Sequence, residues 1–286
     1  MITVHPYVIL DVFTDTPLEG NALAVFPKAA AIPSDRMQAI AREMNLSETV
    51  FILPAEGEGD ARIRIFTPAA ELPFAGHPTL GAAHFLAERD GRERVVLETG
   101  AGPVPVVFER EAGGDGPGRL GRGRMRQPIP TWGPYDRAGD VLAALGVAGA
   151  ELPVELYVNG PRFVYVVLDD PARVAALRPD LNALAALGDV GVYCVAGSGT
   201  RWKARLFAPA IGVTEDPATG SAAGPAAVHL ARHGRIAYGE EIEISQGAEV
   251  NRPSTLYARV LGEGDRIDAV EVGGSAVPVA RGELLV

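Results

Sequence analysis

A chain of 286 residues with 47% hydrophobic and 22% charged residues suits two domains of about 100 to 150 residues, each with a core of its own. Its net charge of −10 disfavours polyanions, and we interpret the four arginines between Arg119 and Arg126 as a solvated turn and inter-domain strand, so no nucleic acid is expected as a partner. The lone Cys194, the absence of a signal-like start and the lack of an apolar run near ~18 residues predict a cytoplasmic protein without disulfides or membrane association.

The first half of the chain is predicted to combine strands with two helices. Ser34 can cap a helix over residues 34–45, where apolar residues recur at helical spacing, and a second helix is predicted over 79–89. The glycine-rich segment 113–123 predicts a mobile loop, and it lacks the Gly-Lys-Ser/Thr ending of a phosphate-binding loop, so nucleotide binding is not supported. Strands are predicted over 7–13, 22–26, 49–53, 61–66, 94–97 and 104–108.

The second half is predicted to be richer in strands. Helices are expected near 140–145, 180–187 and 220–233. Strands are expected over 155–158, 162–167, 192–195, 201–207, 241–245, 255–261, 269–272 and 276–286. Because strands outnumber helices and the two kinds are mixed, we predict an α+β fold.

Two stretches of the chain repeat each other. Arg64-Ile-Phe-Thr-Pro, followed by Gly76-His-Pro, is matched by Arg205-Leu-Phe-Ala-Pro, followed by Glu215-Asp-Pro. One constant spacing aligns His77 with Asp216, and the same spacing aligns the two helix starts. The duplication predicts two similar lobes, each a strand-rich layer around one long helix, facing each other across a cleft. We expect the first lobe to span 1–127 and the second 128–275, and the strand near 276–286 is a candidate to return to the first.

Three polar residues are candidates for proton transfer. Glu48 stands directly before an apolar strand, where a partly desolvated carboxylate can act as a base, although an ordinary strand-entry residue would look the same. His77 is held between Gly76 and Pro78, outside the predicted helix, and serves either as an acid–base group or as a turn histidine. Asp216 precedes Pro217, which favours an extended backbone, and it fits either a cleft residue or a turn residue.

Glycines near the helix starts predict an anion site. At Gly76 and Gly220 the backbone can come close to a ligand, and unpaired N–H groups favour a carboxylate, although glycines there could equally serve helix packing. His229 and His233 lie four residues apart on one helix face, but no third ligand is evident, so no metal is predicted. Cys194 lies in an apolar strand and is interpreted as a buried packing residue.

Taken together, the motifs resemble the PhzF-like phenazine-biosynthesis family of the diaminopimelate-epimerase-like superfamily. The resemblance spans nearly the whole chain and is carried by motifs that occur in the family's order. These are Glu19-Gly-Asn21, Asn45-Leu-Ser-Glu48, Phe74-Ala-Gly-His-Pro-Thr-Leu-Gly81, Glu215-Asp-Pro-Ala-Thr-Gly-Ser-Ala222 and Gln246-Gly with Arg252-Pro-Ser254. Ala22 and Asn251 depart from the residues common in the family at their positions.

The resemblance implies a cofactor-independent isomerase with its site between the lobes. By motif, Glu48 is implied as the base, and His77 and Asp216 as residues that assist proton transfer. Substrate-binding roles are implied for Asn21, Ser47, Gly76, Gly220 and Ser221. The substrate is expected to be a small carboxylate-bearing metabolite, as in the isomerisation of trans-2,3-dihydro-3-hydroxyanthranilate, and the assembly a homodimer.

Two other functions stay open from the sequence. A racemase or epimerase would use Glu48 opposite Asp216 or His77 and return the proton to the opposite face of one carbon. A two-thiol epimerase is disfavoured because Cys194 lies in neither matched loop. A non-catalytic small-molecule-binding protein could have kept the same fold.

Overall fold

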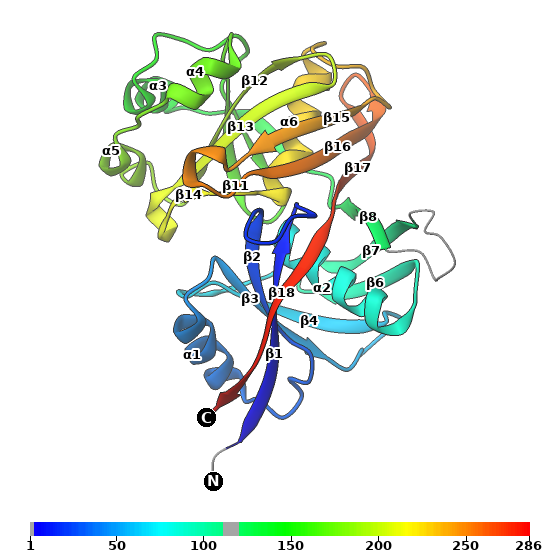
Figure 1. Ribbon diagram of the computed structural model, residues 1–286. Coiled ribbons are helices and arrows are strands. Elements are labelled where there is room, and N and C mark those ends of the chain that lie inside the picture. Colours follow the sequence, from blue (N-terminus) through cyan, green and yellow to red (C-terminus); the bar gives the residue numbers. More distant parts are fainter. Residues whose placement is uncertain (1–2, 111–119) are drawn as a thin grey trace. The chain divides into compact units, whose positions relative to one another are not determined.

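The computed structural model describes residues 3–110 and 120–286, which form two compact units (Figure 1). Unit 1 comprises Met1–Arg126 and Gly273–Val286, and unit 2 comprises Gln127–Val272. Both units mix helices with a larger share of strands, so the predicted α+β class is confirmed. No helix within the described ranges is long and apolar enough to cross a membrane.

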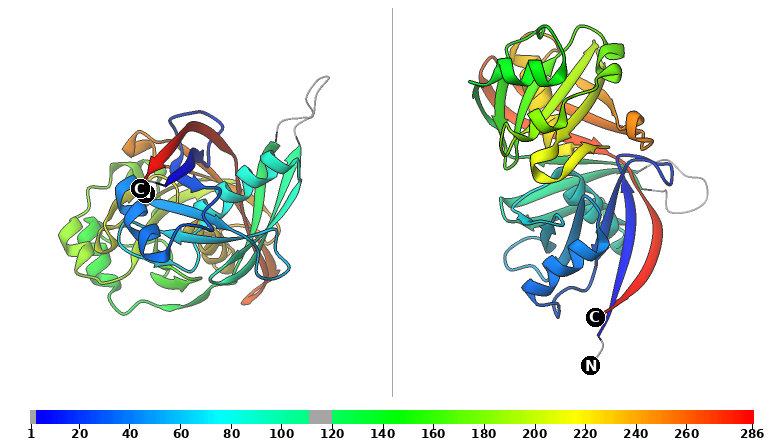
Figure 2. Two further views of the ribbon diagram at one scale, coloured as in Figure 1. Left: turned by 90° about the horizontal axis from the view of Figure 1, so that it is seen from below. Right: turned by 90° about the vertical axis from the view of Figure 1, so that its left-hand side faces the viewer.

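Unit 1 is a mixed sheet with two helices. Its sheet order is β18, β1, β2, β3, β4, β6, β7, β8, with β2–β3 and β4–β6 parallel and β5 paired to β4 as a short hairpin. The elements are β1 (Val4–Val12), β2 (Asn21–Phe26), α1 (Ser34–Met44), β3 (Glu48–Leu53), β4 (Ala61–Phe66), β5 (Glu71–Leu72), α2 (Gly76–Asp90), β6 (Arg94–Thr99), β7 (Gly102–Arg110), β8 (Leu120–Gln127) and β18 (Ala276–Leu285). Strands β1 and β18 run antiparallel side by side from Val4 opposite Leu285 (Figures 1 and 2).

Unit 2 is built in the same way. Its sheet order is β9, β10, β11, β12, β13, β15, β16, with β11–β12 and β13–β15 parallel and β14 paired to β13. The elements are β9 (Thr131–Pro134), α3 (Ala138–Leu145), β10 (Glu155–Val158), β11 (Arg162–Val167), α4 (Pro171–Ala176), α5 (Leu181–Ala185), β12 (Gly191–Ser198), β13 (Arg201–Ala208), β14 (Val213–Asp216), α6 (Gly220–Arg232), β15 (Glu241–Gln246), β16 (Ser254–Glu263) and β17 (Arg266–Gly274). Short 3₁₀ turns cover Pro209–Ile211 and Ala248–Val250.

The strand topology of the two units matches element by element. In each, a parallel pair is followed by an antiparallel neighbour, a short hairpin strand, a long helix, a second parallel pairing and a final antiparallel strand. Helix α2 follows β5 in unit 1, and α6 follows β14 in unit 2. The repeat seen in the sequence as one hairpin and one helix therefore extends over most of each unit.

The long helices α2 and α6 are buried along nearly their whole length. Small residues allow this, because strands must approach the helix backbone closely on several sides. At Gly81, an added Cβ would lie 2.6 Å from a Leu23 methyl carbon and 2.8 Å from one of Val12. Gly81 therefore serves packing of α2 against β1 and β2, which is one of the two roles considered for the glycines near the helix starts.

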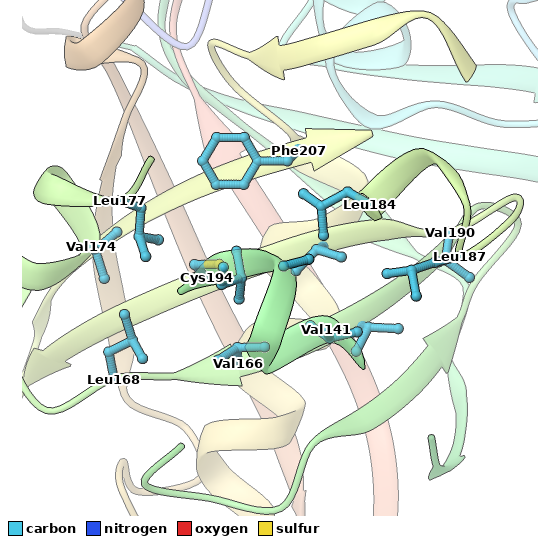
Figure 3. Packing of buried hydrophobic residues seen from close by; sticks show 14 of the residues in the cluster. Val141, Val166, Leu168, Val174, Leu177, Leu184, Leu187, Val190, Cys194 and Phe207 are labelled. Carbon is cyan, nitrogen blue, oxygen red and sulfur yellow. The ribbon is translucent and has the colours of Figure 1, made fainter. Parts of the chain in front are cut away.

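The shorter helices cover a separate core in each unit. In unit 1, Met37 and Ile40 of α1 pack on Phe26, Phe51 and Phe66 of the sheet. In unit 2, helices α3, α4 and α5 cover β11, β12 and β13, and Figure 3 shows their side chains meeting. The members labelled there are Val141, Val166, Leu168, Val174, Leu177, Leu184, Leu187, Val190, Cys194 and Phe207. Burial raises the pKa of the Cys194 thiol well above its usual value, which agrees with a packing role.

One predicted loop is a strand where the structure describes it. Residues 113–119 lie outside the described ranges, but Leu120 to Gly123 belong to β8, so the mobile-loop prediction is wrong for them. Gly123 is buried against Phe108 and Leu80, and an added Cβ would lie 2.6 and 2.8 Å from their carbons. The arginines of this strand alternate with buried residues, and Arg122 and Arg124 each lie 3.6 Å from Glu109.

Candidate active site

The end of α1 sets the position of Glu48. Asn45 adopts a left-handed conformation, with φ of 51°, and its N–H bonds to the Ala41 carbonyl, which closes the helix. Asparagine tolerates this conformation better than most residues. The chain then turns through half-buried Ser47 and enters β3 at Glu48, opposite Leu23 of the parallel strand β2. The Asn-Leu-Ser-Glu motif is thus a helix stop followed by a strand start.

Three predicted site residues meet within unit 1. Asn21 and Glu48 begin the neighbouring parallel strands β2 and β3, and His77 lies in the first turn of α2. Asn21 Nδ2 is 3.4 Å from His77 Nδ1, and His77 Nε2 is 3.4 Å from Glu48 Oε2. The imidazole therefore stands between an amide and a carboxylate.

The surroundings decide the protonation state of His77. The side chain is 4% exposed, and burial lowers its pKa to about 3, so the ring is neutral near pH 7. An amide nitrogen can only donate, so Asn21 directs its hydrogen to Nδ1 and leaves the ring proton on Nε2, facing Glu48. The contact of His77 with Glu48 is consequently between a neutral imidazole and a carboxyl group rather than an ion pair.

The helical placement of His77 corrects the sequence-based expectation. Helix α2 begins at Gly76, three residues earlier than predicted, so His77 is not a turn residue. Pro78 does not prevent this, because backbone N–H groups in the first turn have no intrahelical acceptor. Thr79 secures the turn, since its N–H and its hydroxyl both donate to the Ala75 carbonyl, at 3.3 and 2.7 Å.

The matched segment of unit 2 has a different local structure. Asp216 is the last residue of β14 and is 8% exposed, and α6 begins only at Gly220. Thr219 Oγ1 donates to Asp216 Oδ2 at 2.5 Å. Gln246 Nε2 donates to the Asp216 carbonyl at 2.8 Å, which ties the segment between strand and helix to the end of β15. The spacing that aligns His77 with Asp216 therefore does not align the two helix starts, which lie at Gly76 and Gly220, so that part of the prediction is wrong.

The first turn of α6 is held by side chains from neighbouring strands. Pro225, inside the helix, has no N–H to offer to the Ser221 carbonyl, and Asn159 Nδ2 donates to that carbonyl instead, at 3.0 Å. Gln127 Nε2 donates to the Gly220 carbonyl at 2.8 Å, and the Tyr165 hydroxyl to that of Ala222 at 2.8 Å. These bonds place Gly220 and Ser221 in a defined position.

Each helix start presents backbone donors. In α2 the N–H groups of Gly76 and His77, and in α6 those of Gly220 and Ser221, have no hydrogen-bond acceptor among the described residues. Such groups, together with the helix dipole, attract an anion. Each start is therefore suited to bind a carboxylate.

Several residues of these networks were not singled out from the sequence. Gln246 was noted only as part of a motif, and Thr219, Asn159 and Gln127 were not considered as part of a site. Pro225 was the available signal, because a proline inside a helix leaves a carbonyl that needs another donor. Which donor supplies it depends on the tertiary structure.

The histidine pair of α6 has a third polar neighbour that the sequence did not reveal. Glu155 Oε2 lies 3.1 Å from His229 Nδ1 and 3.4 Å from His233 Nε2, so the three could surround a metal ion. However, Arg232 Nη1 donates to the same oxygen at 2.8 Å, and so does the Tyr157 hydroxyl at 3.0 Å. A fixed guanidinium beside the ligand atoms opposes a divalent cation, so the arrangement favours a hydrogen-bond network.

Comparison with known proteins agrees with the motifs. The model of the phenazine biosynthesis-like protein family matches residues 10–282. The chain is 51% identical over 278 residues to a trans-2,3-dihydro-3-hydroxyanthranilate isomerase of Pseudomonas aeruginosa, covering 97% of this chain and 98% of the relative.

Solved structures show the same likeness. A protein of Pseudomonas aeruginosa described as a predicted epimerase has a TM-score of 0.81 at 34% identity. The match covers 98% of this chain and 99% of that protein. A PhzF-family phenazine biosynthesis protein of Bacillus anthracis has a TM-score of 0.84, covers 99% and 100% of the two chains and, at 23% identity, shows the shared fold. With its motifs, its fold and a match over nearly its whole length, this chain belongs to the PhzC-PhzF family of phenazine biosynthesis-like proteins.

Proposed function

We propose that this protein is an isomerase that converts trans-2,3-dihydro-3-hydroxyanthranilate by moving a proton from one carbon to another. The Pseudomonas aeruginosa relative, 51% identical, carries this activity in its name. The observation in the structure that carries the proposal is the contact of Glu48 with the buried, neutral His77. A reaction that only relocates a proton needs no redox partner, so the expectation of cofactor independence is part of this proposal.

Glu48 acts as the base. Its side chain is 17% exposed, so a substrate can reach it while most of the surrounding water is excluded. The carboxylate takes a proton from one carbon of the substrate, and the same proton or another returns at a conjugated carbon, so that atoms and charge balance. His77 Nε2 lies 3.4 Å from Glu48 Oε2, and the contact of Nδ1 with Asn21 holds the ring in place, so a neutral polar group stands beside the base.

The remaining residues of the proposed site bind and orient the substrate. The cleft between the two lobes belongs to this proposal, with Asp216 assisting proton transfer from the second lobe. The N–H groups at Gly76, Gly220 and Ser221 are donors for the substrate carboxylate, and Ser47 contributes beside the base. A homodimer and a cytoplasmic location remain predictions.

An epimerase is the second candidate. The likeness to a structure described as a predicted epimerase, at 34% identity, is the observation that favours it. An epimerase returns the proton to the opposite face of the same carbon, whereas the proposed isomerase returns it at another carbon. Chiral analysis and NMR of the product separate the two outcomes.

The test replaces the base while preserving its shape. Glu48→Gln is expected to lower kcat/KM on trans-2,3-dihydro-3-hydroxyanthranilate about 10³-fold and to abolish deuterium uptake from D₂O into the substrate. The matched control is Glu43→Gln, the same change at an exposed position of α1, which is expected to leave both rates unchanged. If Glu48→Gln keeps near-wild-type turnover and exchange, Glu48 is not the base. Binding of substrate to the wild-type protein without any exchange would favour the non-catalytic alternative.

A further inference from the structure

The side chain of Gln246, at the end of β15, is buried beneath the Asp216 segment. It is 1% exposed and uses both of its polar atoms there. Nε2 donates to the Asp216 carbonyl at 2.8 Å and to Thr219 Oγ1 at 3.0 Å, and Oε1 accepts from the Thr219 N–H at 3.4 Å. A single glutamine thus joins the residue before Pro217 to Thr219, the residue directly before α6.

These bonds determine where the Thr219 hydroxyl points. A hydroxyl has one hydrogen, and because Thr219 Oγ1 already accepts from Gln246, its hydrogen is available for Asp216 Oδ2, 2.5 Å away. Gln246 therefore donates to the Thr219 hydroxyl, and that hydroxyl donates to the carboxyl group of Asp216. Thr219 itself is 7% exposed, so water does not compete freely for this bond.

The backbone at Gly247, directly after Gln246, packs against the segment that follows Asp216. Gly247 has a φ of 85°, and an added Cβ would lie 2.4 Å from the Pro217 carbonyl oxygen and 2.2 Å from that of Arg252. Only glycine allows the end of β15 to lie this close to the loop. The Gln-Gly motif therefore fixes the Asp216 loop by hydrogen bonds and by direct contact.

We propose that Thr219 and Gln246 are positioning residues of the isomerase, which hold the Asp216 carboxyl group at one angle for proton transfer. Neither residue needs to touch the substrate. The proposal rests on the proposed function for its effect on turnover, whereas the orientation of Asp216 can be measured without turnover. Tyr193 on β12 interacts with Asp216, and its pKa is raised well above its usual value by burial and by the Asp216 charge, so it stays neutral over the useful pH range.

The kinetic test compares two substitutions with a conservative one. Thr219→Val keeps the side-chain shape but removes the donor to Asp216, and it is expected to lower kcat about 10- to 100-fold while KM changes less than about threefold. The acidic limb of the pH profile of kcat is expected to move upward by about one pH unit, because a carboxylate that loses a donor holds its proton more tightly. Thr219→Ser, which keeps the hydroxyl, is expected to have a kcat and an acidic limb close to those of the wild type. Gln246→Met is expected to act in the same direction as Thr219→Val, and the double variant to be less than additive.

A glutamine in unit 1 offers a matched control. Gln38 Nε2 also donates to two loop carbonyls, those of Thr67 and Pro68, at 2.9 and 3.2 Å, without a carboxyl group in the chain of bonds. Gln38→Met is expected to lower the midpoint of thermal unfolding and leave kcat and the pH profile unchanged. If Thr219→Val and Gln246→Met likewise alter only stability, the positioning role is wrong.

A titration keeps this inference separate from the proposed function. The Asp216 carboxyl carbon is followed by NMR in labelled wild-type and Thr219→Val protein, and its midpoint is expected to rise in the variant. If the wild type does not turn over the substrate but the midpoint rises, the proposed function fails and the orientation of Asp216 by Thr219 stands. An unchanged midpoint overturns the inference whatever the activity.

Discussion

An arginine of each repeat copy forms an ion pair with a glutamate of the following short strand, and the two pairs have different surroundings. Arg64 of β4 binds Glu71 of β5 through two hydrogen bonds of 2.6 and 2.7 Å, and Arg205 of β13 binds Glu215 next to Asp216 through two of 2.8 and 2.7 Å. The side chains of the first pair are 18% and 43% exposed, and those of the second 6% and 10%. One pair lies at the surface and the other is part of the interior.

The difference follows from what each arginine contacts next. Arg205 Nη1 also donates to the Leu177 carbonyl at 2.8 Å, at the end of α4, so the pair connects a helix, β13 and β14. Arg64 contacts the exposed Ser34 hydroxyl at 2.6 Å. Because Glu215 directly precedes Asp216, the buried pair fixes the strand that carries Asp216. Similar ion pairs thus join two neighbouring strands in both units, but only the buried one supports a residue of the proposed site.

The largest expected effect is on stability, and it tests whether the buried ion pair contributes more than the exposed one. Glu215→Gln leaves the buried Arg205 charge without its partner and is expected to lower the free energy of unfolding by about 3–5 kcal/mol. Glu71→Gln, the same change at the exposed pair, is expected to cost less than about 1 kcal/mol. Denaturant unfolding of both variants and the wild type measures the difference. Equal losses would show that burial does not distinguish the two pairs.

The second prediction concerns the part of the free energy of unfolding that depends on pH through the protonation of His77. The pKa of His77 is about 3 in the folded protein and ordinarily about 6.5, so the unfolded chain binds the proton more tightly. The stability associated with the neutral ring is complete above pH 6.5 and declines as the pH falls toward 3. Between pH 8 and pH 5 this amounts to about 2 kcal/mol.

The variant His77→Gln isolates this contribution. Its free energy of unfolding is expected to fall less than that of the wild type over the same pH range, by about 2 kcal/mol. His229, whose pKa is lowered to about 4 chiefly by burial, titrates in both proteins and cancels in the comparison. Parallel pH curves for variant and wild type would mean that His77 is not held neutral by burial.

The smallest effect concerns the prolines of the two matched helices. Pro78 lies in the first turn of α2, where its missing N–H costs nothing, whereas Pro225 lies inside α6 and makes the Ser221 carbonyl depend on Asn159. Asn159→Ala is expected to cost about 1 kcal/mol, because it removes one hydrogen bond to a buried carbonyl.

A double-mutant cycle checks that explanation. With Pro225→Ala, residue 225 regains an N–H that can bond to the Ser221 carbonyl, so Asn159→Ala is expected to cost less in that background than in the wild type. The free energies of unfolding of the four proteins give the coupling. Additive costs would mean that Asn159 does not substitute for the missing helical donor.

Local patterns were sufficient for most elements. Apolar periodicity predicted α1 to within one residue of its end, but the predicted cap is wrong, because Pro33 takes the N-cap position and Ser34 is the first helical residue. Asn45 ends that helix because asparagine accepts a left-handed backbone. The strands over 61–66 and 162–167 were predicted with the bounds of β4 and β11. Short elements without a strong pattern of their own, such as β5, β9 and β14, were missed because tertiary pairing defines them.

The sequence by itself determined the α+β class, the duplicated hairpin and helix, and the candidates Glu48, His77 and Asp216, because these depend on neighbouring residues and on motif spacing. Only the tertiary structure decided that His77 is helical, neutral and directed at Glu48, and that Asp216 ends a strand. It also decided that Gly123 packs inside a strand and that Gln246 holds the Asp216 loop. The physical reason is that burial and hydrogen bonds between distant segments set these states, and a local pattern contains neither.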